Sequence, residues 1–475
     1  MGLDRVSSPI SLLALSLFAI DAQGSLLQEL SIARTPPPGA LDDEAVRLVA
    51  VAKPGETLPL RVKLTSRAAE AVPQPLDVIN DLELVPGPCP ASVPAGGVCA
   101  VSKPWRLVID DVDRRHPRLT GGALVAELGG SLSVGQGAKT DTTFPVASSF
   151  GKSRVKLRVR LVRLRQGGPP PIGRDTNDAV RLARGEIDRA SSVWGVCGVS
   201  FGPSIETDVR VVDPPPPHLL SLGCDAPALA MGGEIAFNVD GQEARVSISA
   251  GTSPRGAARR VAAELERLGF RATVSDNRRT HAATTPSSDV LVAKKTGQLA
   301  TLSAPKRGPI STDSALDVCI GRVSLEDGLQ HFSDSVALSG TLEERTLIKA
   351  FDDGDPSTLD VFMVPSFGGD ARIGESFIFT DHGAIRNVVI EDRAGLRAQR
   401  ASFTLAHEIG HVLLDQPGHP DDFQSDTPTS LMDADAVNAT AFGPRRLSVS
   451  ECERAHRQSG PKSLPRLLAP WSGKK

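Results

Sequence analysis

The stretch of residues 401–414 constrains the fold of this chain more than any other part of its sequence. It predicts an amphipathic helix, because apolar residues recur there at helical spacing. His407 and His411 lie four residues apart, so both imidazoles project from one face of that helix. Burying two imidazoles beside the carboxylate of Glu408 is costly unless a metal or hydrogen-bonding partners compensate. The chain must therefore fold so that this face contacts either a metal ion or hydrogen-bonding partners.

The pattern HExxH, formed by His407, Glu408 and His411, is suited to a catalytic zinc ion. Two imidazole nitrogens on successive turns can both reach one zinc at about 2.1 Å. Glu408 is rotated by about 100° from His407, so its carboxylate can reach a metal-bound water without occupying the metal. Such a water has a pKa lowered to about 7 and becomes a nucleophile when a carboxylate removes its proton. The alternative is a pair of core histidines satisfied by hydrogen bonds.

A third protein ligand is expected just after this helix, because catalytic zinc sites hold three protein ligands and leave one position open. The helix should end at residues 416–418, and His419 follows at once. Carboxylates also bind zinc. The alternatives for the third ligand are therefore Asp415, Asp421 and Asp422.

The sequence HEIGHVLLDQPGH, followed by SLMDAD, resembles the signature of the metzincin clan of zinc metallopeptidases, in which a Met-turn follows HExxHxxGxxH. The order of elements after the N-terminal third of the chain is also similar: strand, long helix, strands, active-site helix, Met-turn and C-terminal helix. The resemblance implies a zinc site formed by His407, His411 and His419. It also implies that Glu408 is the general base and that Met432 lies beneath the metal as a packing residue.

Two departures from that signature affect the expected geometry. In the clan the third histidine follows the second by six residues, whereas His419 follows His411 by eight and Leu414 takes the place of the turn glycine. We therefore expect a longer helix, with Gly418 reversing the chain. The chain also contains no tyrosine, a residue that some members carry after the Met-turn. Zinc and backbone N–H groups would then stabilise the transition-state charge.

A chain of 475 residues is too long for one hydrophobic core, so we expect several domains. Residues 25–150 contain short β-type runs at a spacing of roughly ten residues, which predicts an antiparallel β-sandwich with a structural or adhesive role. Residues 151–232 and 305–475 predict the two parts of a metzincin-like α/β catalytic domain, and the second part carries the zinc site. Residues 233–304 predict a small inserted α/β module. The expected class is multidomain α+β.

Patterns within these regions predict individual elements. In RVKLRVRLVRLR, which starts at Arg154, apolar residues alternate with cations, as in a strand whose cationic face is solvated. Residues 175–194 then predict a long helix. Later, STLDVFMVPSF predicts an apolar strand, IRNVVIEDR predicts an edge strand, and residues 447–458 predict a C-terminal helix. In the inserted module, Ser253 is the expected N-cap of a helix.

The net charge of −3 provides no basic stripe or polybasic patch, which argues against nucleic acid and anionic membranes as partners. The apolar run at residues 10–20 is too short to span a bilayer. It reads as a weak signal peptide covering residues 1–24, or else as a buried segment of the first domain. Six cysteines favour an oxidising compartment, and Cys89 and Cys99 bracket a short loop that a disulfide could close. We therefore expect a secreted or periplasmic protein without an integral membrane segment.

The expected function is that of a zinc-dependent endopeptidase, whose protein or peptide substrate would pair with the edge strand at residues 388–390. The alternatives are a catalytically silent binding or adhesion protein with the same fold and a zinc hydrolase acting on a non-peptide amide. A second metal, calcium, is expected only if the acidic loop DDGDPSTLD holds it rather than forming a plain turn. The carboxylates of that loop belong to Asp352, Asp353, Asp355 and Asp360.

Overall fold

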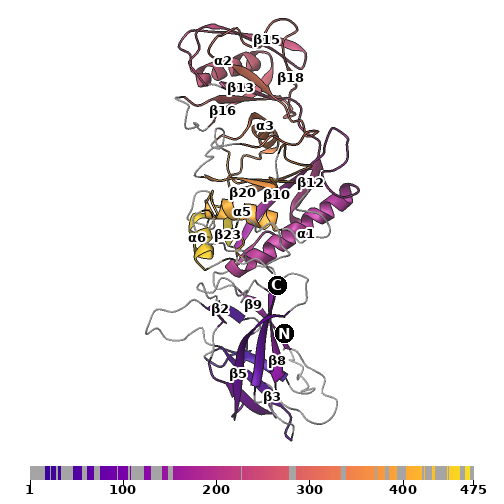
Figure 1. Cartoon of the computed structure of the whole chain (residues 1–475), viewed down its shortest axis with the longest axis vertical. Coiled ribbons are helices and arrows are strands. Elements are labelled where there is room, and N and C mark those ends of the chain that lie inside the picture. The colour runs from indigo at the N-terminus through magenta and orange to yellow at the C-terminus, as the bar shows by residue number, and fades with distance from the viewer. Residues whose placement is uncertain are drawn as a thin grey trace, which may run out of the picture.

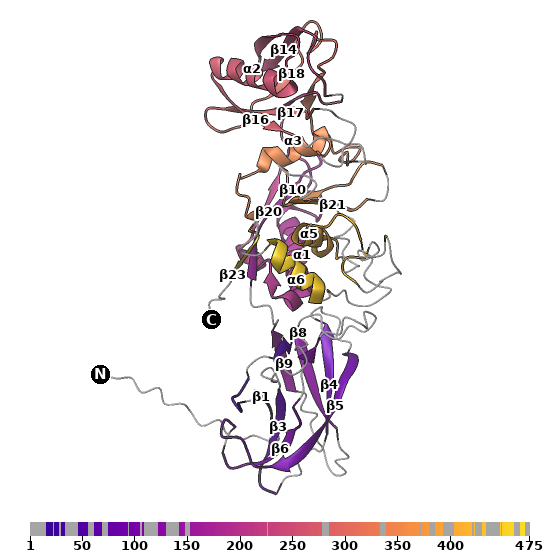
Figure 2. The same ribbon diagram turned by 90° about the vertical axis from the view of Figure 1, so that its left-hand side faces the viewer.

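The structure is a computed structural model and describes the following residues: 16–21, 23–27, 30–33, 46–55, 61–68, 75–93, 95–104, 107–108, 122–129, 142–147, 153–225, 227–277, 285–332, 339–369, 372–379, 385–392, 403–419, 422, 430–433, 447, 449–459 and 466–470. These residues form a mixed α/β protein with several sheets, which agrees with the expected multidomain α+β class. Three parts lie in a row along the long axis: an N-terminal β-region, a central α/β domain and a module at the far end (Figures 1 and 2).

Among the described residues, the N-terminal region is a nine-stranded sheet in the order β1-β3-β6-β5-β4-β8-β9-β2-β7. Its strands are β1 (Ser16–Ile20), β2 (Leu30–Ala33), β3 (Arg47–Ala52), β4 (Arg61–Ala68), β5 (Pro75–Gly87), β6 (Val98–Ser102), β7 (Leu107–Val108), β8 (Gly122–Gly129) and β9 (Thr142–Ala147). The first part of β5 pairs with β4 and its last part with β6. Strands that change partner in this way form the corners of sandwiches.

Neighbouring strands of this sheet are antiparallel, except that β2 runs parallel to both β7 and β9. The prediction of a wholly antiparallel arrangement is therefore wrong at this edge. Parallel pairs require long connections between the two strands. The spacing of short β-type runs reports only on hairpin neighbours, so it did not reveal these pairs.

The apolar run near the N-terminus contributes a strand to this sheet. β1 pairs along its whole length with β3, and its residues Leu17, Ala19 and Ile20 are buried. Cleavage near residue 24 would remove this strand. Residues 1–15 lie outside the described residues, and the signal peptide stays a prediction. No described helix is long and apolar enough to cross a membrane.

The six cysteines form three disulfides: Cys89–Cys99, Cys197–Cys452 and Cys224–Cys319. The first is the predicted closure of the short loop. The other two join residues that are far apart in the sequence, and their spacing alone did not indicate the pairing. Three disulfides fit an oxidising compartment, as for an extracellular or periplasmic protein.

The central domain is built on a sheet in the order β11-β10-β20-β22-β21, and β12 and β23 also pair with β10. Its strands are β10 (Ser153–Val162), β11 (Val199–Ser200), β12 (Asp208–Val212), β20 (Thr358–Val364), β21 (Gly374–Phe377), β22 (Val388–Asp392) and β23 (Leu468–Pro470). β10 runs parallel to β12 and β20, and β20 runs parallel to β22. β21 is an antiparallel strand at the edge.

The prediction that residues 388–390 form an edge strand is therefore wrong. These residues belong to β22, which lies between β20 and β21. Every residue of β22 is buried. Strands that are covered on both faces read as continuous apolar runs, and the polar residues that flank this run suggested an edge. The true edge strand, β21, has only four residues, so its pattern is too short to stand out.

Helices cover both faces of the central sheet. α1 (Thr176–Trp194), α5 (Thr404–Leu414) and α6 (Val449–Ser459) share a hydrophobic core with β10, and α3 (Leu342–Phe351) packs on the opposite face. Two short 3-10 turns, η1 (Gly195–Cys197) and η2 (Ser204–Glu206), follow α1. The predicted long helix and C-terminal helix are thus confirmed to within about two residues.

The cationic face of β10 is solvated only in part: Lys156 is exposed as predicted, but the next two cations are not. Arg160 is buried and pairs with Asp208 of β12 at 2.8 Å. Arg158 is largely buried and pairs with Asp353 at 2.8 Å. The carboxylates that compensate these cations come from a neighbouring strand and a loop that are distant in the sequence, so alternation within β10 alone suggested exposure.

The module forms two small sheets around α2 (Pro254–Arg267), in the orders β16-β17-β13-β19 and β15-β14-β18. Its strands are β13 (Leu219–Leu222), β14 (Gly233–Val239), β15 (Gln242–Ile248), β16 (Phe270–Asp276), β17 (Ser288–Lys294), β18 (Leu302–Ser303) and β19 (Val318–Gly321). The Ser253 side chain caps α2 as predicted, accepting from the Gly256 N–H at 3.2 Å. The predicted bounds 233–304 are too narrow, because β13 and β19 pair with each other and belong to this core.

A buried ion cluster anchors the module to the central domain. Asp289 of β17 accepts from Arg345 at 3.0 Å and from Lys349 at 2.5 Å, and both cations belong to α3. Burial raises the pKa of Asp289, but the Lys349 and Arg345 charges outweigh burial and hold that pKa well below its usual range. The module is therefore attached through charges that are compensated only while α3 and β17 stay in contact.

Candidate metal site

The floor of the site is formed where α5 contacts the Met-turn sequence and α1. Gly410 faces Met432, and a β-carbon at position 410 would lie 2.3 Å from the Met432 Sδ atom. The indole Nε1 of Trp194, at the end of α1, donates to the Ala406 carbonyl of α5 at 3.0 Å. Met432, Trp194 and Ala406 are all buried. Met432 thus packs directly against α5.

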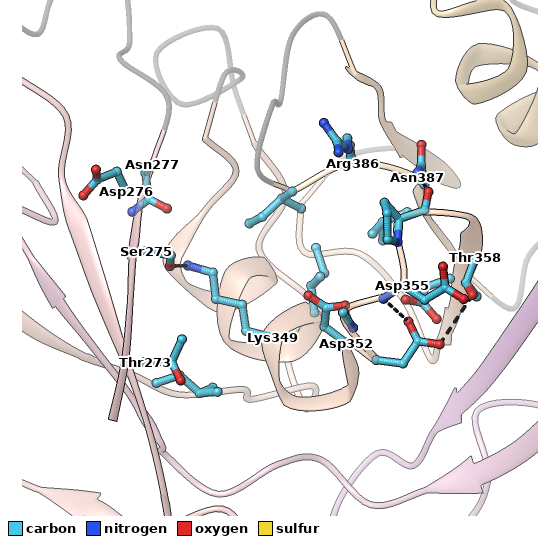
Figure 3. Close-up of a pocket in the computed structure, with 18 of the residues that line it drawn as sticks. Thr273, Ser275, Asp276, Asn277, Lys349, Asp352, Asp355, Thr358, Arg386 and Asn387 are labelled. Atoms are coloured by element: carbon cyan, nitrogen blue, oxygen red, sulfur yellow. Dashed lines mark hydrogen bonds between the residues drawn. The ribbon is translucent and has the colours of Figure 1, made fainter. Parts of the chain in front are cut away.

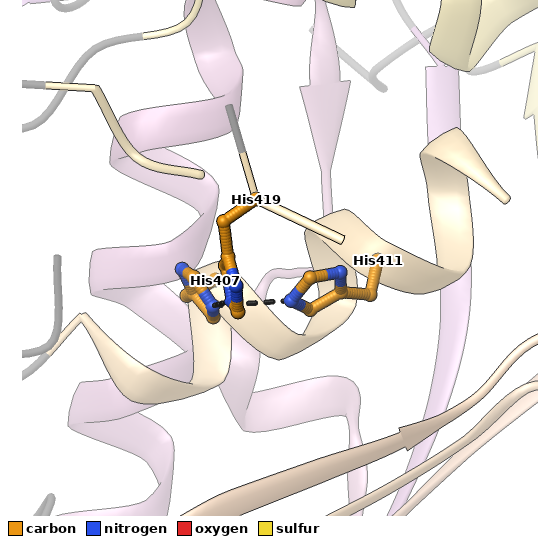
Figure 4. A group of neighbouring side chains, drawn as sticks. All are labelled: His407, His411 and His419. Atoms are coloured by element: carbon orange, nitrogen blue, oxygen red, sulfur yellow. Dashed lines mark hydrogen bonds between the residues drawn. The ribbon is translucent and has the colours of Figure 1, made fainter. Parts of the chain in front are cut away.

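Three imidazoles meet above this floor. The Nε2 atom of His407 lies 3.1 Å from the Nε2 of His411 and 3.3 Å from the Nε2 of His419. Figure 4 shows His407 and His411 projecting from successive turns of α5, with His419 reaching over from the segment that follows the helix. The three side chains offer nitrogen atoms that all lie within 4.8 Å of one another. The expected grouping of these histidines is therefore present in the structure.

The opposite ring nitrogens decide which tautomers are present. Nδ1 of His407 lies 2.7 Å from the Leu431 carbonyl oxygen, and Nδ1 of His411 lies 2.6 Å from the Gln416 carbonyl oxygen. A carbonyl oxygen only accepts, so each Nδ1 must carry the proton. Burial lowers the pKa of His411 to about 4, so this ring is neutral at neutral pH. When His407 is neutral as well, the Nε2 atoms of the two rings face each other as lone pairs.

The chain turns toward His419 earlier than predicted. α5 ends at Leu414, and Asp415 is its C-cap in the left-handed conformation with a φ of 48°. The predicted reversal at Gly418 is wrong, because an aspartate tolerates this conformation and ends the helix first. Arg454 of α6 stabilises the turn by donating to the Leu414 carbonyl at 2.8 Å and to the Gln416 side chain at 2.7 Å.

The carboxylate alternatives for the third ligand have different positions. Asp422 accepts from the His419 backbone N–H at 2.7 Å, and its carboxylate lies 3.6 Å from the His419 Nδ1. Its carboxylate therefore lies on the Nδ1 side of His419, away from the Nε2 atom that faces His407. Asp415 serves as the C-cap of α5. Asp421 lies outside the described residues.

Glu408 lies beside the imidazole group and contacts the edge strand β21. The Ser376 hydroxyl lies 2.5 Å from the Glu408 Oε2 and 2.8 Å from the Glu408 carbonyl oxygen. Gly374 leaves room for the side chain, because a β-carbon there would lie 2.3 Å from the Glu408 Oε1. Burial raises the pKa of Glu408. Sequence reasoning missed both Ser376 and Gly374, since no local pattern links them to a helix about thirty residues later.

The acidic loop lines a separate cavity of about 780 Å³ between α3, β16 and the start of β20. Figure 3 shows Asp352 and Asp355 on one side of this cavity and Lys349 with Ser275 on the other. Asp355 pairs with Lys156 at 3.0 Å. Asp360, whose pKa is raised to about 7 by burial, lies 3.5 Å from the Arg158 Nε. These cations favour the plain acidic turn, and calcium stays a prediction.

No protein-family model matches the chain, and no curated protein is significantly similar to it. The function is therefore inferred from the geometry of the site. The structure brings His407, His411 and His419 together, places Met432 beneath α5 and places the buried Glu408 against β21.

Proposed function

We propose that the protein is a zinc-dependent endopeptidase of the metzincin type. The observation that supports this most directly is the contact between the Nε2 atoms of His407 and His411 at 3.1 Å. When both rings are neutral, both atoms are acceptors, because each Nδ1 proton is given to a carbonyl oxygen. Two lone pairs at this distance repel each other unless a cation lies between them. The buried setting makes that repulsion stronger than it would be in water.

The spacing of the nitrogens suits zinc. Zinc–imidazole bonds of about 2.1 Å in a tetrahedron place two ligand nitrogens about 3.4 Å apart. The distances of 3.1 and 3.3 Å from the His407 Nε2 are close to that value. Three neutral imidazoles are a donor set that zinc accepts in catalytic sites. His407, His411 and His419 would therefore hold the ion.

When bound, zinc would lower the pKa of a water and polarise the scissile carbonyl. Glu408 would accept a proton from the attacking water and return it to the leaving amine. Its position supports both steps, because the side chain follows His407 on α5 and is held against β21 rather than among the ligands. The raised pKa of Glu408, caused by burial, brings this carboxyl closer to the working range of a general base and acid.

The substrate path that we propose follows β21 rather than β22. β21 pairs with β22 on one side only and is the last strand of the central sheet among the described residues. An extended peptide can pair with such an edge through backbone hydrogen bonds. Ser376 of β21 contacts Glu408, so a peptide along this strand would pass the general base.

The proposal is tested by cleavage of a peptide library with wild-type protein, Glu408→Gln and the control Glu266→Gln, whose side chain is exposed on α2. We expect the wild type and Glu266→Gln to cleave, a chelator to stop cleavage, and zinc to restore it. Glu408→Gln should lose activity by at least about 100-fold while elemental analysis finds one zinc per chain. A metal-replete wild type that leaves the library intact would point instead to a silent binding protein or to a non-peptide substrate.

A further inference from the structure

Ser376 makes two contacts with a single residue of the active-site helix. Its hydroxyl oxygen lies 2.5 Å from the Glu408 Oε2 and 2.8 Å from the Glu408 main-chain oxygen. Gly374, two residues earlier on β21, lets the Glu408 side chain lie flat on the strand, because any β-carbon there would overlap Oε1. The carboxyl of Glu408 thus lies between the Ser376 hydroxyl and the space that a side chain at Gly374 would fill.

The Ser376 hydroxyl links two parts of Glu408. A serine hydroxyl has one proton to donate, and both the Oε2 and the main-chain oxygen of Glu408 lie within its reach. The shorter contact favours donation to the carboxylate oxygen. The contact therefore fixes the Glu408 side chain relative to its own main chain and to β21.

We propose that Ser376 is a positioning residue that keeps the Glu408 carboxyl aimed at the reacting water. This inference rests on the proposed function. Ser376 acts through Glu408 and lies on the edge strand, so it also sets the distance between the general base and a peptide paired with β21. Alanine at this position would leave the zinc ligands unchanged and remove only the hydroxyl.

The first test compares Ser376→Ala, Ser376→Thr and the control Ser303→Ala, whose side chain is exposed on β18. We expect Ser376→Ala to lower kcat by about 10- to 100-fold, the usual effect of losing a group that orients an active-site residue. KM and the zinc content should not change. Ser376→Thr retains a hydroxyl and should restore most of the kcat, and Ser303→Ala should behave as wild type.

The second test does not depend on hydrolysis. The infrared difference between metal-free wild type and Glu408→Gln assigns the carboxyl band of Glu408. Ser376→Ala should shift that band, and Ser376→Thr should return it toward its wild-type position. If the wild type cleaves nothing but the band shifts in this way, the contact stands and the proposed function fails.

Either of two results would overturn the inference. One is a Glu408 band that is unchanged in Ser376→Ala, whatever the activity. The other is an active wild type in which Ser376→Ala keeps its kcat, or in which Ser376→Ala and Ser376→Thr lose kcat equally. The melting temperature of each variant separates these results from a failure to fold.

Discussion

The sulfur of Met432 occupies the space that a side chain on Gly410 would need, since a β-carbon there would lie 2.3 Å from Sδ. Gly410 lies in α5 between the metal-binding candidates His407 and His411. The close approach of the Met-turn to the helix is thus possible only because this helical position carries no side chain. The glycine would otherwise be unfavourable in a helix interior.

Gly410→Ala should therefore destabilise the protein by about 1–3 kcal/mol, the usual cost of overpacking a core, and weaken zinc binding. The matched control is Gly185→Ala in α1, where an added β-carbon meets nothing within 4 Å among the described residues. That substitution should raise the free energy of unfolding by up to about 1 kcal/mol, because alanine is the better helix former. Denaturant unfolding measures both. Equal stability of the two variants would contradict the packing of Met432 against α5.

Arg454 should affect the zinc affinity of the proposed site without contacting its three histidines. Its guanidinium donates to the Leu414 carbonyl, the Asp415 carbonyl and the Gln416 side chain, which fixes the turn that leads to His419. Arg454→Ala should lower zinc affinity by about 10- to 100-fold.

Arg454→Lys should recover little of that affinity, because an ammonium group lacks the planar fork that serves several acceptors. The control is Arg307→Ala, an exposed position in the module. Competition with a zinc indicator measures the affinity. A normal affinity in Arg454→Ala would show that His419 is held by other contacts.

The metal-free protein should lose stability in acid through His411. Burial lowers the pKa of this histidine from 6.5 to about 4. The unfolded chain then binds the proton more tightly, so stability is lost as the pH falls from about 6.5 to about 4. The contribution is on the order of 3 kcal/mol. The free energy of unfolding should be measured between pH 4 and 7 in wild type and His411→Asn. The difference between the two free energies should become smaller as the pH falls. A constant difference would mean that this ring titrates normally.

A second pH dependence of stability should come from Glu375 of the edge strand β21. Burial of Glu375 in β21, together with the neighbouring carboxyl of Glu344 in α3, raises the pKa of Glu375 to about 11. Its folded-state pKa lies above the unfolded value, so keeping the proton costs stability as the pH rises from about 4.5.

Glu375→Gln should therefore become more stable than wild type with increasing pH, by up to about 1.4 kcal/mol per pH unit. Glu266→Gln, at an exposed position, should show no such slope. Unfolding curves between pH 5 and 9 make the comparison. If the difference in the free energy of unfolding between Glu375→Gln and wild type does not change with pH, the carboxyl is ionised in the folded protein.

Local patterns predicted the elements whose folding depends on neighbours in sequence. The helical spacing around His407 and His411 predicted α5, and Ser253 predicted the start of α2. The proximity of His419 also followed, because a short connection after a helix leaves its residues little choice of position.

Contacts between distant segments were not predictable in the same way. The edge position of β21 depends on which strands pair, and the burial of Arg160 depends on a carboxylate from β12. Ser376 and Gly374 are recognisable as site residues only once β21 and α5 are in contact. The end of α5 at Asp415 was mispredicted because glycine is the commoner residue in the left-handed conformation at a helix end, whereas here an aspartate adopts it.

The module enters and leaves the central domain through β13 and β19, which are paired side by side, and Cys224–Cys319 ties the two strands together. Its chain ends are therefore adjacent, so a short linker could replace the whole unit without stretching the polypeptide that leads to α3. Such an excision would leave Arg345 and Lys349 without Asp289. A minimal version of the central domain would thus need neutral residues at those two positions before it could be produced as a separate protein.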